Sequence, residues 1–252
     1  AIRALKEASQ HLNGRKILVI LDEFNALLIA EQHADLEDAI FRNLRAIMAE
    51  DINISWLLIM QDSEYMTPSL WGSARQIIQQ AHSIPLTNLS PAYARKLILE
   101  PMKSYRINFI TPDIPDEIIR ISAGNPYLIK LLCSFLVDAA KNQNITSITH
   151  ADLEEAVINL LSEGERFFDH FRKELTAPQM DMLHRLNQHI LRTPQSGYTQ
   201  FLQSLAKTKQ YRHSETHIEE SIDAMHRQGI LIINRQKNTI QFAVPLFQRW
   251  LN

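Results

Sequence analysis

The sequence predicts a parallel α/β segment followed by a longer helical region. Two apolar runs rich in β-branched residues, 16–21 and 54–60, are short enough to be strands, and a helical pattern at 35–50 lies between them. A strand, a crossover helix and a second strand form one βαβ unit of a parallel sheet. Because both runs are almost entirely apolar, we expect strands that are buried on both faces.

Two neighbouring carboxylates, Asp22 and Glu23, follow the first strand directly. Open α/β sheets place their ligands at this carboxyl edge, and paired acids there suit Mg²⁺ and phosphate chemistry. The simpler alternative is a buried strand that runs into an acidic helix N-cap. A two-carboxylate hydrolase is a further alternative, but the sequence offers no third convergent group for it.

The region after residue 80 predicts a short strand at 83–86 and then a series of helices. Ser90 and Pro91 begin a helix through 103, and another follows at 113–122. Gly124 ends that helix, and Pro126 begins a buried helix through 141. Further helices are expected at 150–161 and after Ser162, where aromatic residues lie at helical spacing.

The last third of the sequence predicts a winged helix. Helices at 177–191, 198–206 and 214–228 precede two strands, 230–234 and 239–244, joined by a polar turn, and a short helix closes the chain. We therefore expect a fold of α/β class, with part of a nucleotide-binding parallel sheet and its helices, followed by an all-α lid and a winged-helix domain. The expected boundaries are 1–88, 89–162 and 163–252.

Together, these motifs resemble the P-loop ATPases of the AAA+ and STAND kinds. The strand with Asp22 and Glu23 is similar to a Walker B segment, and Gly124-Asn125-Pro126-Tyr127 is similar to the GNP motif of STAND lids. The resemblance implies ATP and Mg²⁺ as cofactors of the intact protein. It implies that Asp22 holds the metal, that Glu23 activates water, and that Asn125, Pro126 and Tyr127 line the adenine side.

Two further roles follow from the resemblance alone. Gln61, after the second strand, would be sensor 1, with Ser63 as the second choice; a polar strand end in solvent is the alternative. Arg75 would be an arginine finger for a neighbouring subunit; the alternative is a solvated helix residue.

The phosphate-binding loop of such ATPases is missing from the sequence. None of the six glycines begins a Gly-x-x-x-x-Gly-Lys-Ser/Thr motif. We predict that this chain alone does not hydrolyse ATP and that its partner is a missing N-terminal P-loop segment of the same protein. The first residue, Ala1, lies in an amphipathic pattern, which also suggests a piece of a longer protein.

Composition favours a cytoplasmic globular protein. The one cysteine, Cys133, excludes an internal disulfide, and no apolar run is long enough to span a membrane. The net charge is −2, with 17 Lys/Arg against 23 Asp/Glu in residues 1–175 and 9 against 5 in residues 176–252. The tail is therefore mildly basic, which is not a strong nucleic-acid signature.

The sequence leaves three functions open. Our first expectation is an ATP-dependent switch that couples nucleotide state to domain rearrangement or self-association. Its expected partners are another protein and, in a homo-oligomer, further copies of itself. The alternative is a DNA-handling AAA+ ATPase, of the initiator or transposition-helper type, whose winged helix contacts duplex DNA. The third is a pseudo-ATPase scaffold. Four carboxylates on helix 214–228 argue against its insertion into a groove, and the candidate phosphate contacts lie around it: Lys207, Lys209, Arg212, Arg235 and Lys237.

Overall fold

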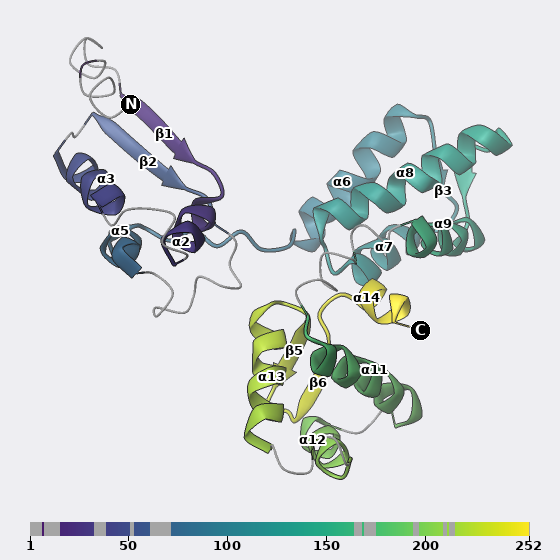
Figure 1. Cartoon of the computed structure of the whole chain (residues 1–252). Coiled ribbons are helices and arrows are strands. Elements are labelled where there is room, and N and C mark those ends of the chain that lie inside the picture. The colour runs from purple at the N-terminus through teal and green to yellow at the C-terminus, as the bar shows by residue number, and fades with distance from the viewer. Residues whose placement is uncertain are drawn as a thin grey trace. The chain divides into compact units, whose positions relative to one another are not determined.

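The computed structural model is mostly helical with small sheets (Figure 1). It describes residues 7, 16–32, 39–50, 53–60, 72–163, 168, 175–193, 197–208, 211 and 215–251. The chain divides into two compact units, residues 1–85 and 86–252, each described below by itself. The helices in these ranges include none that is both long and apolar enough to cross a membrane.

The first unit is built on two parallel strands. β1 (Ile17–Leu21) pairs with β2 (Ile54–Leu58) in register from Ile17 opposite Ile54 to Leu21 opposite Leu58. The crossover contains α3 (Ala39–Glu50), which confirms the predicted βαβ unit. A short 3-10 turn, η2 (Gly72–Ala74), leads into α5 (Arg75–Gln80), close to the predicted helix.

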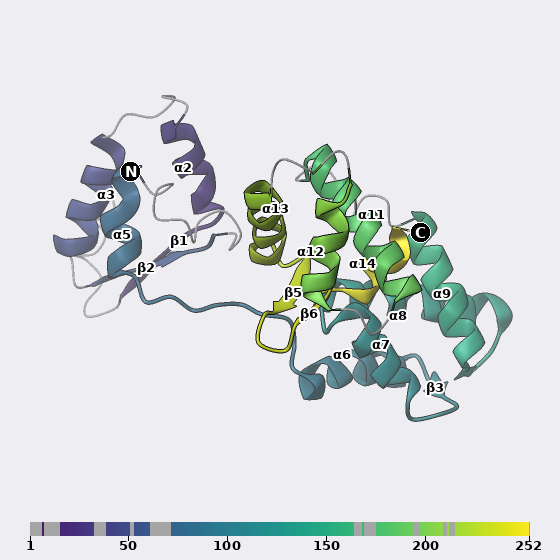
Figure 2. The same ribbon diagram turned by 90° about the horizontal axis from the view of Figure 1, so that it is seen from below.

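The expectation that both strands are buried on both faces is wrong. Figure 2 shows α2, α3 and α5 on one side of the strand pair. On the other side, Leu18 and Ile20 of β1 are 60% and 53% exposed, and Leu57 and Ile59 are 41% and 40% exposed. Along each strand, buried or half-buried side chains alternate with exposed ones, because the described helices cover only one face of the strand pair.

Two other local predictions are corrected in this unit and its connection. The sequence predicts a short linker after Glu23, but this stretch contains the helix α2 (Phe24–Gln32), whose Phe24 and Leu28 are buried one turn apart. The strand expected at 83–86 is absent, because residues 82–90 are irregular and join no ladder. The sequence also predicts a helix at 1–12, and apart from residue 7 this stretch lies outside the described residues.

The second unit begins with four helices. They are α6 (Pro91–Ser104), α7 (Ile114–Ser122), α8 (Pro126–Gln143) and α9 (His150–Glu163). The helix starts and ends agree with those predicted to within a few residues. The sequence did not predict a small parallel pair, β3 (Asn108–Phe109) with β4 (Ser147–Ile148), which ties the loop before α7 to the loop before α9.

The described residues of the rest of this unit form four helices and a hairpin in the predicted order. They are α11 (Ala177–Arg192), α12 (Tyr198–Ala206), α13 (Glu215–Arg227), then β5 (Leu231–Asn234) antiparallel to β6 (Thr239–Phe242) and α14 (Pro245–Trp250). Thr176 begins α11 with a capping box closed by Gln179.

One hydrophobic core runs through the whole second unit. It includes Ile98 and Leu132 of the first four helices and Leu183 and Phe242 of the later part. The last helix, α14, packs against α7 and α9 as well as against β6. The lid and winged-helix portions that the sequence predicts therefore share one core, and their boundary at 162 stays a prediction.

Candidate functional site

The acid pair forms a turn between β1 and α2. Glu23 has a left-handed backbone (φ 50°), and its N–H donates to Asp22 Oδ1 at 2.9 Å. The Glu23 carbonyl accepts from the Ala26 N–H at 2.8 Å, which starts the helix. Both acidic side chains are exposed. Their oxygens are therefore open to a hydrated ion at the carboxyl end of a parallel strand.

The backbone on each side of the acid pair is held to the second strand. Ile59 N–H donates to the Leu21 carbonyl, and Phe24 N–H donates to the Ile59 carbonyl, both at 2.9 Å. The buried Phe24 ring meets Phe41 of α3 edge-on, with ring centroids 6.0 Å apart. These contacts hold Asp22 and Glu23 between two fixed points.

The donor set fits a magnesium ion that keeps most of its own water. Mg²⁺ is commonly bound by one or two carboxylates together with waters and a substrate phosphate. Among the described residues, no group of three or more His, Cys, Asp or Glu side chains could enclose a metal. Asp22 and Glu23 therefore suit a metal that arrives with a phosphate, not a closed protein cage.

Two of the residues predicted near the acid pair have different outcomes. Gln61 lies outside the described residues, as does Ser63, so the sensor assignment stays a prediction. Arg75 is the first residue of α5 and is exposed. Its role as an arginine finger depends on a neighbouring subunit and also stays a prediction.

The Gly124 corner joins α7 to α8. Ala123 and Gly124 both have left-handed backbones (φ 52° and 74°), and Gly124 N–H donates to the Ile119 carbonyl at 3.0 Å. The Gly124 carbonyl accepts from Leu89 N–H at 2.9 Å, and a Cβ at 124 would lie 2.6 Å from the Leu89 oxygen. Glycine is therefore required both by the backbone angle and by the close approach of the Leu89 backbone.

Asn125 uses its side chain to cap α8. Its Oδ1 accepts from the N–H groups of Tyr127 at 3.0 Å and Leu128 at 3.1 Å. Pro126, at the first helical position, and Tyr127 are exposed. The geometry explains Asn125 as a helix cap, while the adenine-contact role of Asn125, Pro126 and Tyr127 stays a prediction.

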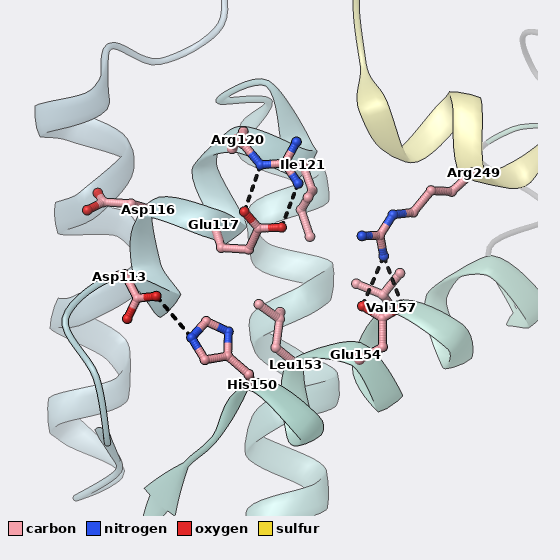
Figure 3. Close-up of a pocket in the computed structure, with 10 residues that line it drawn as sticks. All are labelled: Asp113, Asp116, Glu117, Arg120, Ile121, His150, Leu153, Glu154, Val157 and Arg249. Carbon is pink, nitrogen blue, oxygen red and sulfur yellow. Dashed lines mark hydrogen bonds and ion pairs between the residues drawn. The ribbon is translucent and has the colours of Figure 1, made fainter. Parts of the chain in front are cut away.

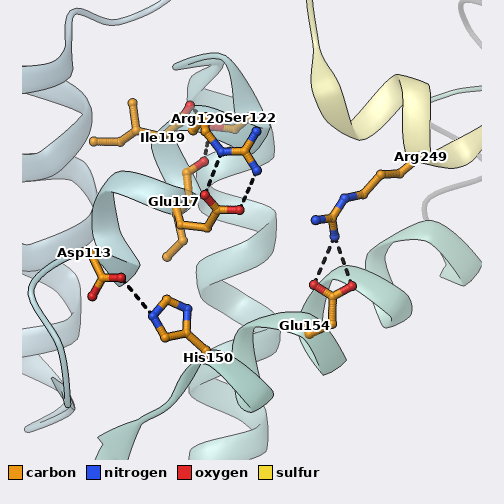
Figure 4. Close-up of polar contacts among 9 residues, drawn as sticks. Asp113, Glu117, Ile119, Arg120, Ser122, His150, Glu154 and Arg249 are labelled. Carbon is orange, nitrogen blue, oxygen red and sulfur yellow. Dashed lines mark hydrogen bonds and ion pairs between the residues drawn. The ribbon is translucent and has the colours of Figure 1, made fainter. Parts of the chain in front are cut away.

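An ionic cleft that the sequence did not predict lies among α7, α9 and α14 (Figure 3). Its volume is about 360 Å³. Figure 4 shows that its basic side chains face acids: Arg120 donates to Glu117 at 2.7 and 2.6 Å, and His150 Nε2 lies 3.0 Å from Asp113 Oδ2. The hydrogen bond from Arg120 lowers the pKa of Glu117, and the same bond raises the pKa of Arg120.

The same cleft contains an ion pair between distant parts of the second unit. Arg249 of α14 donates from Nη1 to both carboxylate oxygens of Glu154 of α9 at 3.0 Å. Glu154 is largely exposed, so the pair contributes only about 0 to 1 kcal/mol. Both arginines of the cleft, Arg120 and Arg249, are already paired with acids, so the cleft offers no unpaired arginine to an anion. The Arg249–Glu154 pair connects α14 to α9. Pairs this distant in the sequence carry no local signal.

The candidate DNA contacts divide into three groups. Lys209 and Arg212 lie outside the described residues. Arg235 Nη2 donates to both oxygens of Asp223 at 2.7 and 2.8 Å, and this bond raises the pKa of Arg235 and neutralises its charge locally. Lys207, at the end of α12, and Lys237, in the hairpin turn, are exposed. Of the five candidates, Lys207 and Lys237 are therefore the two whose charged groups are exposed and not paired with an acid within the described residues.

The third helix of the tail remains acidic in the structure. Glu219 and Glu220 are exposed on α13, while Asp223 is occupied by Arg235. A polyanion would be repelled by this face.

Comparison with known proteins gives a match in structure alone. No family model matches the sequence, and neither does any curated protein sequence. Among solved structures, the chain is similar to the structure of the Aeropyrum pernix ORC2 protein in ADPNP-ADP complexes. The TM-score is 0.64 at 15% sequence identity, over 99% of this chain and 67% of that chain. At this identity the likeness shows the fold: over nearly its whole length, the chain folds like that ORC2 protein.

Proposed function

We propose that this chain is part of a nucleotide-dependent, DNA-handling protein of the AAA+ type, of the initiator or transposition-helper kind. The observation that carries the proposal is the fold shared with an ORC2 protein over 99% of the chain. That protein was solved in ADPNP-ADP complexes, which supports the nucleotide part of the proposal. The likeness also favours DNA handling over the signalling switch that the sequence alone ranked first.

In this proposal the acid pair serves the nucleotide. Asp22 would hold Mg²⁺ through water, and Glu23 would orient and polarise an attacking water. The exposed carboxylates at the end of β1 support this assignment. The bound metal would supply neutralisation of phosphate charge. Asn125, Pro126 and Tyr127 would contribute contacts on the adenine side.

The phosphate-binding loop would come from a segment outside these 252 residues. The sequence contains no such loop, and the bare face of β1 and β2 supports a missing neighbour. Parallel sheets are nearly always covered on both faces, so four exposed aliphatic side chains there call for a covering layer. We accordingly propose that this chain alone does not hydrolyse ATP.

Titration calorimetry and a phosphate-release assay test the nucleotide part. The isolated chain should bind MgATP weakly at best and release no phosphate, and Asp22→Ala should change neither result. Micromolar affinity or turnover that disappears in Asp22→Ala would show that the chain carries a complete site. That outcome would overturn the assignment of the loop to another segment.

Fluorescence anisotropy with a labelled duplex tests the DNA part. Lys207 and Lys237 would contact backbone phosphates, because their charges are exposed and unmatched within the described residues. The pair of substitutions Lys207→Gln and Lys237→Gln should weaken duplex binding. The control is Arg235→Gln, which removes a charge already matched by Asp223 and should weaken binding less.

A nucleotide-dependent switch without DNA is the second candidate. It is favoured by the shared core of the second unit and by the Arg249–Glu154 contact, which together would let one end of this unit respond to the other. A change in oligomer size on adding nucleotide to the longer protein, in the absence of DNA, would support the switch. An unchanged size together with salt-dependent DNA binding would support the first proposal.

A further inference from the structure

A second cationic surface lies on the outer face of α6 and α8. It consists of Lys96 and Lys103 on α6 and of Lys130 and Lys141 on α8, all four of them exposed. Seven residues separate the first two and eleven separate the others, close to two and three helical turns. Each pair therefore follows one side of its helix, opposite the buried stripe that includes Ile98 of α6 and Leu132 of α8. We name this surface the α6–α8 face.

The two helices that carry these lysines are packed together along their length. At one end, Leu89 N–H, just before α6, donates to the carbonyl of Gly124, just before α8. At the other end, Lys141 Nζ lies 4.7 Å from the ring centroid of Tyr105, which follows α6. Figure 1 shows the two helices beside one another, and they are in contact. The face is thus a continuous strip about 20 Å long.

The lysines of this face are not neutralised by the protein. Several arginines of the second unit are paired with carboxylates, including Arg95 with Asp116 and Arg185 with Asp181. None of the four lysines has a carboxylate within ion-pair distance in the ranges that the structure describes. Glu100 and Asp138 lie exposed on the same two helices, so the face carries four positive charges against two negative ones. It does so in the part of the chain that is acidic overall.

Exposed tyrosines lie beside these lysines. Tyr93 is 65% exposed and lies under Lys96, whose Nζ is 5.8 Å from the ring centroid. Tyr105 is 54% exposed and lies under Lys141. Unpaired bases of a single strand can stack on exposed aromatic rings. The ammonium groups beside these rings attract the phosphates of the same strand. Duplex DNA hides its bases and would use only the lysines.

From this arrangement we infer that the α6–α8 face binds single-stranded DNA, with the four lysines on phosphates and Tyr93 and Tyr105 stacking on bases. The inference rests on the proposed DNA-handling function and adds a second, separate contact surface to it. In this view, Lys207 and Lys237 hold the duplex, and the α6–α8 face holds a separated strand. The surface was not among the contacts that the sequence predicted.

Anisotropy titrations with two labelled probes test the inference on the full chain. One probe is a thymidine oligonucleotide of about 20 nucleotides and the other is a duplex of the same length. The face variant replaces Lys96, Lys103, Lys130 and Lys141 by Gln, and the tail variant replaces Lys207 and Lys237 by Gln. Urea unfolding of each variant checks that the fold is kept, which is expected because all six side chains are exposed.

The face variant should bind the oligonucleotide at least about tenfold more weakly, and its slope of log affinity on log salt should become shallower by about 3, close to 0.7 for each lost phosphate contact. The tail variant should bind the oligonucleotide as the unchanged chain does. Replacing Tyr93 and Tyr105 by Leu keeps every lysine and should weaken oligonucleotide binding about fivefold or more, with little effect on the duplex.

The possible failures are distinguishable. If the face variant binds the oligonucleotide normally while the tail variant loses the duplex, the inference is wrong and the proposed function stands. If the face variant loses both probes equally and the tyrosine variant loses neither, the face is a general phosphate surface and the single-strand inference is wrong. If the unchanged chain binds neither probe, the inference and the proposed DNA function both fail.

Discussion

Asn238, in the hairpin turn, caps α12 through Thr199. Its Oδ1 accepts from both the backbone N–H and the Oγ1–H of Thr199 at 2.8 Å, although 39 residues separate the two. Gly197 occupies the N-cap position itself and has no side chain to offer. A Cβ at Gly197 would lie 2.2 Å from the backbone carbonyl oxygen of Asn238 and 2.5 Å from its side-chain nitrogen. The hairpin and the helix are therefore fitted to each other, with the glycine leaving room for the asparagine that replaces its cap.

Replacing Asn238 by glycine should destabilise the second unit by about 0.5 to 1.5 kcal/mol, the usual net contribution of an intramolecular hydrogen bond. Glycine keeps the left-handed backbone of this residue (φ 52°), so the loss reports the hydrogen bonds to Thr199. Urea unfolding followed by circular dichroism measures it. The matched control is Asn144→Gly, at a similar φ of 54° after α8, which should be near neutral. Equal losses in the two variants would contradict the capping role.

Replacing Gly124 by alanine should cost more than the same change at Gly229. Both glycines have left-handed backbones (φ 74° and 70°), so each change costs about 1 to 2 kcal/mol from backbone strain. At Gly229 nothing lies within 4 Å of the added Cβ, whereas at Gly124 the Leu89 oxygen would be 2.6 Å away. The overlap should add about 1 to 3 kcal/mol to the loss in unfolding free energy. Similar losses would show that the Leu89 contact is readily released.

Tyr211 should ionise late, and its contribution to stability should depend on pH. Burial, together with its hydrogen bond to Asp181 Oδ2 at 2.8 Å, raises the pKa of Tyr211 from 10.0 to about 12. Because the folded chain holds this proton more tightly than the unfolded chain, the contribution is full below pH 10 and is lost as the pH rises through 12. Tyr211→Phe should therefore lower the unfolding free energy by about 1 kcal/mol near neutral pH and by progressively less in alkali. Tyrosinate absorbance should lose its latest step in this variant; an unchanged titration would contradict the assignment.

Asp181 should show the opposite dependence. Burial makes the largest contribution and raises its pKa, but hydrogen bonds from Arg185 at 2.6 Å and from Tyr211 together outweigh it, so the pKa of Asp181 is lowered below 3.8. The stabilisation is present above pH 3.8 and is lost as the pH falls through the lowered pKa. In Asp181→Asn, the stability difference from the unchanged chain should shrink in acid. A difference that is constant down to about pH 2 would contradict this.

Cys133 should resist alkylation in the folded chain. Its side chain is buried in α8, and burial raises the pKa of the thiol to about 12, so the reactive thiolate is scarce at neutral pH. Iodoacetamide labelling followed by mass spectrometry should be slow in buffer and fast in urea. Rapid labelling under native conditions would show that the core around α8 opens easily.

The helices of the second unit were predictable because their signals are local. Pro91, Pro126 and Gly124 mark starts and ends within a few residues of the observed ones. The missed elements depend on distant partners. α2 is fixed by the contact of Phe24 with Phe41, and β3 pairs with β4 across almost forty residues. No local pattern reports such contacts.

The residue types of the candidate site could be predicted from the sequence. Which of its charged side chains are neutralised by an ion pair could not. The acid pair follows from an apolar run that ends in Asp22 and Glu23, and the structure places them at a strand end as expected. That Asp223 neutralises Arg235, and that Glu154 holds Arg249, emerges only when the hairpin and α14 are folded against their helices. The continuous apolar run also misled, because it does not say which face of β1 the rest of this chain covers.

The salt dependence of duplex DNA binding by the unchanged chain tests the proposed DNA-handling function most directly. If exposed lysines bind backbone phosphates, log affinity falls linearly with log salt concentration, with a slope of about −0.9 for each phosphate contact. We predict a slope of about −2 or steeper, reduced by nearly 2 when Lys207 and Lys237 are both replaced by Gln. No binding at low salt, or binding that salt does not weaken, would contradict the account.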